Sequence, residues 1–175
     1  VAFRMLPKVV WEMPAYGTFN LHASLLPDYR GAAPINWAII NGEKQTGVTT
    51  FFIDDKIDTG AMILSSEIEI GANENAGHLH DRLMQLGSKT VIETLSIIEK
   101  GNVITTIQED KNPIKTAHKL DKENCKIDWS KSGIEIYNLI RGLSPYPSAW
   151  CFFSDGNQEW NIKIYKAEFE QEKHS

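Results

Sequence analysis

The chain has 175 residues, of which 42% are hydrophobic and 23% charged, a composition typical of a soluble globular protein with one domain, or one and part of another. Its 18 basic and 23 acidic residues give a net charge of −5, which argues against an extended phosphate-binding surface but is compatible with a local basic channel. Without a membrane-length apolar run, and with only Cys125 and Cys151 as cysteines, it is predicted to be reduced, cytoplasmic and independent of membranes.

The chain opens with short apolar and helical segments. Residues 1–5 are strand-like, residues 7–13 suit a short helix with a proline near its first turn, and residues 18–22 form the next predicted strand. A buried strand of this kind needs neighbours on both sides. We therefore expect the chain to begin inside a domain, as a fragment of a longer protein.

An α/β pattern follows. Residues 27–33 are predicted as an irregular loop, and the helix that follows ends near Gly42. The β-branched and aromatic residues 46–54 and the segment 62–70 are predicted strands, joined by a loop over residues 54–60.

A long helix is predicted next. Asn73 or Asn75 can cap its start, it continues to about Lys100, and Gly101 stops it. Its spacing predicts a buried face made of Leu79, Leu83, Leu86, Val91, Leu95 and Ile98.

The composition changes after this helix. Residues 102–132 are polar and irregular, with residues 109–124 the least structured, and they indicate a linker. An amphipathic helix "GIEIYNLIRGL" and two strands, "SAWCFF" and "EWNIKIYKAEF", follow, with an Asp-Gly turn between the strands. We therefore predict an α/β portion over residues 1–101, a linker over 102–125 and the start of a small β-rich domain over 126–175.

Asn20 and His22 stand out on the second predicted strand. Residues two apart on a strand share a face, so both side chains point the same way, at a strand end of a predicted parallel sheet where ligands bind. Asparagine can hold an oxyanion, and histidine can donate a hydrogen bond or move a proton. Asp58 is the candidate carboxylate partner, with Asp54 and Asp55 as rivals. Such a set suits acyl-group transfer without a covalent intermediate.

Structural interpretations compete with these roles. An Asn-x-His pair is more often a satisfied structural pair, and Asp58 before Thr-Gly could form an Asx-turn. Ser24 lacks the Gly-x-Ser-x-Gly surroundings of a nucleophile. The five histidines show no zinc spacing, so we predict no metal site.

The stretch "FNLHASLLPDYRGAAPINWAIINGEKQTGVTTFFIDDKIDTG" resembles the signature region of the 10-formyltetrahydrofolate-dependent formyltransferases. That family carries Asn-x-His-x-Ser-Leu-Leu-Pro-x-x-Arg-Gly, then Thr-Gly-Val-Thr and then Asp-Thr-Gly, with the same His-to-Asp spacing. The resemblance implies a Rossmann-like formyltransferase domain, of which the C-terminal half is present, and Asn20, His22 and Asp58 as the catalytic trio. It also implies 10-formyltetrahydrofolate as co-substrate, without a metal.

The resemblance also implies where the folate would bind. The family's folate contacts fall on Ser24, Leu25, Leu26 and Pro27, and the backbone of Arg4, Met5 and Leu6 and the loop near Ile57 would hold the pterin ring. Asp28 adds a negative charge close to these contacts.

Three further stretches resemble the family members that act on methionyl initiator tRNA. They are "RGAAPINWAIINGEKQTGVT", "VAFRMLP" and the segment over residues 126–150. This likeness implies formyl transfer from 10-formyltetrahydrofolate to the α-amine of methionyl initiator tRNA, and an OB-like β-barrel, begun by residues 126–175, that helps to grip the tRNA. The family's full chain is much longer.

Alternatives stay open. Amino-sugar formyltransferases and 10-formyltetrahydrofolate hydrolases can carry a similar extension, whereas the glycinamide ribonucleotide enzyme lacks it. A truncated piece could also be a non-catalytic folate- or tRNA-binding module. We expect the whole protein to be a monomer, and the fragment, with an open sheet edge, to self-associate.

Overall fold

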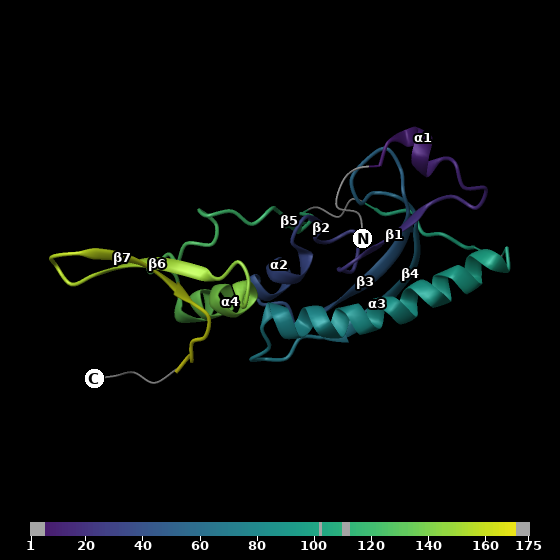
Figure 1. Cartoon of the computed structure of the whole chain (residues 1–175). Helices are drawn as coiled ribbons and strands as arrows, with labels where there is room; N and C mark the ends of the chain where they lie inside the picture. The colour runs from purple at the N-terminus through teal and green to yellow at the C-terminus, as the bar shows by residue number, and fades with distance from the viewer. Residues whose placement is uncertain (1–5, 102, 110–112, 171–175) are drawn as a thin grey trace.

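The computed structural model describes residues 6–101, 103–109 and 113–170, so the strand predicted over residues 1–5 lies outside the described residues. Figure 1 shows a small sheet with a long helix along one face, and a hairpin at the far end of the molecule from the first helix. In chain order the elements are α1 (Lys8–Trp11), β1 (Phe19–His22), β2 (Arg30–Gly31), α2 (Pro34–Ile40), β3 (Gln45–Phe52), β4 (Met62–Glu69), α3 (Ala76–Glu99), β5 (Thr116–Ala117), α4 (Gly133–Leu143), β6 (Ala149–Ser154) and β7 (Glu159–Ile164).

The main sheet has the order β1-β3-β4, and both of its strand pairs are antiparallel. The predicted parallel pairing is therefore wrong for these strands. The connection between β3 and β4 spans only residues 53–61, whereas a parallel crossover needs about a dozen residues or more. Within the described residues, parallel pairing occurs between the two-residue strands β2 and β5.

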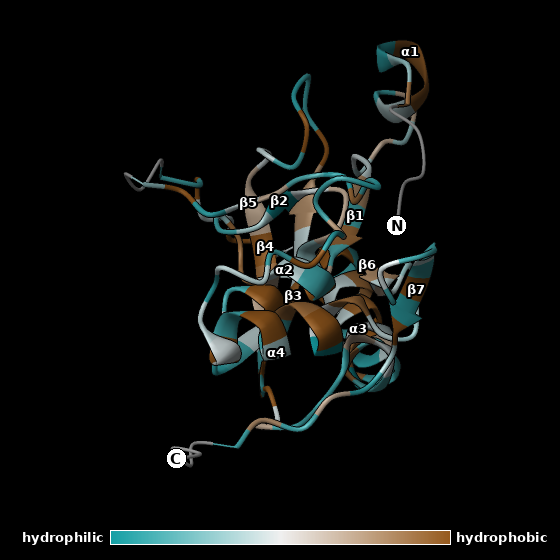
Figure 2. Ribbon diagram, turned by 90° about the vertical axis from the view of Figure 1, so that its left-hand side faces the viewer, coloured by the Kyte–Doolittle hydropathy of each residue, from teal (hydrophilic) through white to brown (hydrophobic). Residues whose placement is uncertain are grey.

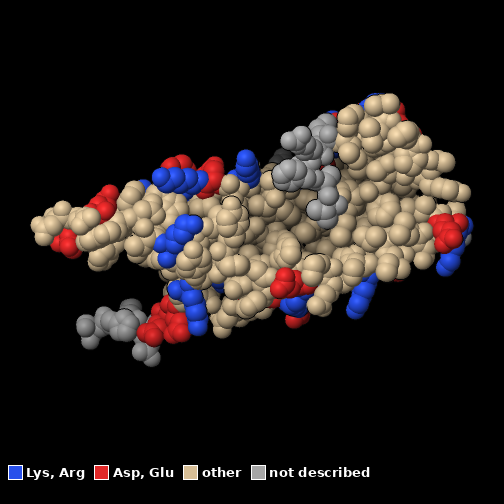
Figure 3. Space-filling model, viewed as in Figure 1, with Lys and Arg blue, Asp and Glu red and all other residues tan. Residues whose placement is uncertain are grey.

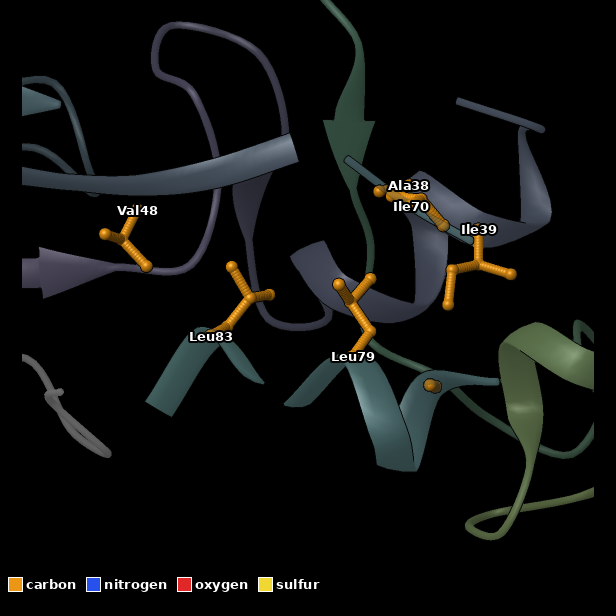
Figure 4. Close-up of a cluster of buried hydrophobic side chains, with 7 residues drawn as sticks. Ala38, Ile39, Val48, Ile70, Leu79 and Leu83 are labelled. Atoms are coloured by element: carbon orange, nitrogen blue, oxygen red, sulfur yellow. The ribbon is translucent and has the colours of Figure 1, made fainter. Parts of the chain in front are cut away.

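Two hydrophobic clusters hold these elements together. The first joins α2, α3 and the sheet and consists of Ala38, Ile39, Val48, Ile70, Ala76, Leu79 and Leu83. Figure 4 shows Leu79 and Leu83 pointing from α3 toward α2 and the strands. The second lies under α4 and β6 and contains Cys125, Ile127, Ile140, Leu143, Ala149, Trp150 and Cys151. Both cysteines are free thiols. Burial of this apolar surface is the main stabilising term for both halves.

Helix α3 confirms the predicted capping at its start but not all of its predicted buried face. Asn75 accepts a hydrogen bond from the His78 backbone N–H at 2.9 Å. The buried face consists of Ala76, Leu79, Leu83, Gly87, Thr90 and Thr94. Leu95, predicted to be buried, is 50% exposed. The buried face of α3 lies close to the strands: a Cβ on Gly87 would lie 2.7 Å from a Leu21 methyl carbon, and the Thr94 hydroxyl lies 2.8 Å from that of Thr50.

The predicted linker is more ordered than its composition indicates. Thr106 exchanges two backbone hydrogen bonds with Met62, at 2.8 and 2.9 Å, and β5 pairs with β2. Within the stretch predicted to be the least structured, residues 109–124, the described part is irregular apart from the two-residue strand β5 and a turn that begins at residue 122. The chain returns beside the edge strand β4, where Thr106 pairs with Met62, and Figure 1 shows β5 before the green chain that leads to α4.

The surface varies along the molecule. Figure 2 shows α1 standing apart from the packed elements, and its Val9 and the nearby Met13 are each 74% exposed. Figure 3 shows Lys and Arg intermixed with Asp and Glu on the face drawn, without an extended basic patch among the described residues. Within the described part of the chain, every helix is too short or too polar to cross a membrane.

Candidate active site

A cavity of about 510 Å³ opens where β1 ends and the loop after β3 begins. Its walls are mostly apolar, and a few polar side chains converge on it, as is typical of small-molecule sites. The lining residues are Leu6, Asn20, Leu21, His22, Ala23, Gly31, Ala32, Ala33, Pro34, Ile35, Asn36, Phe51, Ile53, Asp54, Lys56, Ile57 and Asp58. The structure thus brings the predicted trio of Asn20, His22 and Asp58 to one cavity.

Asn20 and His22 reach the cavity from the same strand. In β1 they lie opposite Phe51 and Thr49 of β3, two positions apart, and so share a face as predicted. Asn20 is partly buried, whereas His22 is buried, with 7% of its surface exposed.

The imidazole of His22 is held on both sides. Its Nε2 lies 2.8 Å from the backbone oxygen of Tyr29, and its Nδ1 lies 3.6 Å from Asp58 Oδ2. Because a carbonyl oxygen can only accept, Nε2 carries a proton in either charge state of the ring. Nδ1 is the nitrogen that faces the Asp58 carboxylate. The 3.6 Å separation is an ion-pair contact, too long for a direct hydrogen bond.

Asp58 is fixed by its own backbone and by two neighbours. Its φ of 55° places it in the left-handed region, which Asp tolerates better than most residues. The Gly31 backbone N–H donates to its Oδ2 at 3.1 Å, and Gln108 Nε2 donates to its backbone oxygen at 2.9 Å. These bonds hold the carboxylate on the side of His22.

The rival carboxylates have other contacts. Asp54 accepts hydrogen bonds from the Lys56 backbone N–H at 2.9 Å and from the Thr59 hydroxyl at 2.8 and 3.0 Å, and thereby closes its own loop. Asp55 lies 3.8 Å from Lys8 Nζ. Neither is the carboxylate facing His22.

The predicted folate residues divide into three groups. Leu6 and Ile57 line the cavity, and Ile57 is 65% exposed. Arg4 and Met5 lie outside the described residues. Ser24, Leu25, Leu26 and Pro27 are not among the lining residues and belong to a tightly packed loop. In that loop the Ser24 hydroxyl donates to the Asp28 oxygen at 2.7 Å, and the Leu26 N–H donates to Thr49 Oγ1 at 3.2 Å. Folate contact by these residues stays a prediction.

Tyr29 and Gln108 were missed by sequence reasoning. Tyr29 is 5% exposed, and its hydroxyl donates to Glu43 Oε1 at 2.5 Å and accepts from Asn41 Nδ2 at 3.1 Å. Burial, followed by the Glu43 contact, raises the pKa of Tyr29 above its usual value. The tripeptide Tyr-Arg-Gly in the sequence was a signal that could have pointed to Tyr29. Gln108 had none, because it lies in the predicted linker, 50 positions from Asp58.

Gly31 is predicted to be intolerant of a side chain. Its φ is 127°, and a Cβ would lie 2.3 Å from the backbone oxygen of Ala117. We expect Gly31→Ala to lower the free energy of unfolding by about 2–4 kcal/mol, through overpacking and backbone strain. Urea unfolding measures this. Gly101→Ala is the control: φ is 70° but nothing lies within 4 Å, so a loss as large as that of Gly31→Ala would contradict the steric argument.

Glu43 offers a pH-dependent test. Burial opposes its ionisation, but hydrogen bonds from Lys115, at 2.5 Å, and Tyr29 outweigh it and hold its pKa below 4.5. A lowered folded-state pKa stabilises the fold above the ordinary pKa, and this contribution is lost as the pH falls through the lowered value. Glu43→Gln should therefore cost less than about 1 kcal/mol at neutral pH, and the difference should shrink below pH 4.5. Urea unfolding at both pH values tests this, with exposed Glu67→Gln as control; a growing difference would contradict it.

Two family profiles match the chain. One described as "Formyl transferase" matches residues 2–95, and one described as "Formyl transferase, C-terminal domain" matches residues 119–175. The two matched regions flank the segment that contains Gln108. Their description agrees with the family predicted from the motifs.

Relatives give the same result. A methionyl-tRNA formyltransferase of Flavobacterium johnsoniae is 79% identical over 175 residues, which is 100% of this chain and 56% of that protein. A solved N-formyltransferase of Helicobacter canadensis, in complex with folinic acid and dTDP-3-aminofucose, has a TM-score of 0.65 and 29% identity over 71% of this chain and 46% of its own.

A more distant structure, HypX of Aquifex aeolicus with tetrahydrofolic acid, has a TM-score of 0.72 and 22% identity over 86% of this chain and 26% of its own. This likeness concerns the fold alone. Together with the family profile over residues 2–95, it supports the predicted α/β, Rossmann-like fold of the N-terminal portion. The β6–β7 hairpin does not by itself establish an OB-like barrel.

Proposed function

Since this chain belongs to the formyltransferase family, we propose that the whole protein transfers a formyl group from 10-formyltetrahydrofolate to the α-amine of methionyl initiator tRNA. One observation carries the chemistry: the His22 imidazole lies between a backbone carbonyl and the Asp58 carboxylate, with Asn20 beside it in one cavity. The choice of acceptor is supported by the 79% identity to a methionyl-tRNA formyltransferase.

The reaction needs an oxyanion site and a route for one proton. The amine attacks the formyl carbon, and the tetrahedral oxyanion accepts hydrogen bonds from the Asn20 amide and from Nδ1 of protonated His22. The Asp58 carboxylate lies 3.6 Å from this Nδ1 and orients the ring. The proton lost by the amine passes, through water and the His22–Asp58 pair, to N10 of tetrahydrofolate as the C–N10 bond breaks. The products are the formamide and tetrahydrofolate.

The cavity suits the folate part of the substrate. Its walls, among them Leu6 and Ile57, offer apolar surface to the pterin ring, and a bound folate would displace water from the reacting atoms, which would strengthen the electrostatic contacts of the trio. We assign the pterin ring to this side, with the backbone of Arg4, Met5 and Leu6, and assign the folate contacts of the following loop to Ser24–Pro27.

The remaining parts of the proposal concern organisation. Residues 1–101 are assigned to the catalytic domain, residues 102–125 to a linker, and residues 126–175 to the start of an OB-like domain that helps to grip tRNA. The chain spans 56% of the length of its Flavobacterium johnsoniae relative. We propose a monomer for the whole protein and self-association for this chain alone.

The test is an acceptor assay with the whole protein and 10-formyltetrahydrofolate labelled in the formyl group. Transfer of label to methionyl initiator tRNA would support the proposal. Label on an amino sugar, as in the acceptor class of the Helicobacter canadensis complex, would replace it with a sugar formyltransferase. Formate release without any acceptor would indicate a hydrolase, and ligand binding without turnover a non-catalytic module.

A further inference from the structure

We propose that the chain between the two family-matched regions is a positioning element of the active site, and that Gln108 is its main positioning residue. We call the described residues 103–109 and 113–118 the crossing segment. It follows α3 in the chain, pairs with the edge strand β4 at Thr106 and Met62, and then forms β5, which pairs with β2 (Figure 1). This proposal rests on the proposed function, because it concerns the geometry of the pair formed by His22 and Asp58.

Gln108 is buried, with 8% of its surface exposed, and its side chain makes a complete set of hydrogen bonds. Its Nε2 donates to the backbone oxygens of Asp58 and Gly60, at 2.9 and 2.8 Å. Its Oε1 accepts from Nε and Nη2 of Arg30, at 3.0 and 2.8 Å. An amide has two N–H donors and two acceptor lone pairs, and all four are used here. A glutamate in its place would keep the Arg30 contacts but could not donate to the two carbonyls.

The two carbonyls belong to the loop that carries the catalytic carboxylate. Asp58 has a left-handed backbone, a conformation that persists only where its surroundings enforce it. Gln108 supplies that enforcement from outside the loop, by binding the carbonyl of Asp58 itself and that of Gly60. When these bonds are lost, the backbone can relax and the carboxylate can move from its place 3.6 Å from His22 Nδ1.

The same segment also supports the histidine. The Tyr29 N–H donates to the Lys115 oxygen at 2.6 Å, and the Tyr29 oxygen contacts His22 Nε2 at 2.8 Å. The Lys115 N–H donates in turn to Asp28 Oδ1 at 3.2 Å, which gives the extra negative charge of Asp28 a structural role. Tyr29 is thus fixed through its backbone between the crossing segment and the imidazole. The positions of both His22 and Asp58 therefore depend on how the crossing segment packs.

The experiment compares Gln108→Glu and Gln108→Met with the wild type in the whole protein. Both variants lose the donors to Asp58 and Gly60, and only Gln108→Glu keeps an acceptor for Arg30. We expect kcat to fall about 10- to 100-fold in both, because small misplacements of catalytic groups cost rate, with KM for each substrate nearly unchanged. Exposed Glu109→Gln is the control and should behave as wild type. Circular dichroism establishes the folded fraction used to normalise kcat.

A second readout does not depend on turnover. The Gly31 amide donates to Asp58 Oδ2, so its hydrogen exchange reports where the carboxylate lies. We expect faster Gly31 exchange in both Gln108 variants and unchanged exchange in Glu109→Gln. Wild-type kcat together with wild-type Gly31 exchange would overturn the positioning role. Failure of the wild type to formylate any acceptor would overturn the proposed function, and Gly31 exchange would still decide whether Gln108 holds Asp58.

Discussion

Replacement of His22 by glutamine should lower kcat for formyl transfer by about 10³-fold, within the range that general acid–base groups contribute. The amide nitrogen of glutamine can take the place of Nε2 and donate to the Tyr29 oxygen, so the buried hydrogen bond at this position is kept. The glutamine side chain then presents to Asp58 no group that can be protonated. Single-turnover transfer of labelled formyl by the whole protein measures the chemical step directly.

The matched control is His80→Gln, the same substitution at a histidine whose side chain is 61% exposed on α3. It should leave the rate unchanged. Urea unfolding of both variants separates loss of chemistry from loss of fold, and we expect the two midpoints to stay close to that of the wild type. A near-normal rate for well-folded His22→Gln would remove the imidazole from the mechanism.

The parts of the fold that could be predicted depend on local patterns. The shared face of Asn20 and His22 follows from the two-residue period of a strand, and the capping by Asn75 follows from its own side chain. Asp58 could be singled out because it begins the contiguous motif Asp-Thr-Gly. In each case the determining contacts span only a few positions.

The parts that could not be predicted depend on distant contacts. Leu95 has a helical spacing suited to burial, yet β3 and β4 approach α3 so closely that small and hydroxyl side chains take the buried positions: Thr94 contacts Thr50 at 2.8 Å. The antiparallel pairing of β1 with β3 has no local signal. Gln108 is polar within a polar stretch, and its role follows only from the return of the chain beside β4 to the loop with Asp58.

The choice among the three carboxylates decides the last prediction. Asp58→Asn should lower kcat by about 10²- to 10³-fold, since the amide can still accept from the Gly31 N–H but leaves no negative charge opposite His22 Nδ1. Asp54→Asn should reduce kcat far less, because its oxygen can still accept from Thr59 and Lys56. Steady-state transfer rates at equal folded fraction, determined by circular dichroism, compare the two.

The comparison is informative because both residues line the same cavity on one loop, and both substitutions remove one negative charge. If only the negative electrostatic potential in the cavity mattered, the two substitutions would lower kcat alike. If instead kcat depends on the contact with His22, only Asp58→Asn should lower it by about 10²- to 10³-fold, since Asp58 Oδ2 is the oxygen that lies 3.6 Å from His22 Nδ1. A larger loss in Asp54→Asn than in Asp58→Asn would transfer the role to Asp54 and require the loop to rearrange when substrate binds.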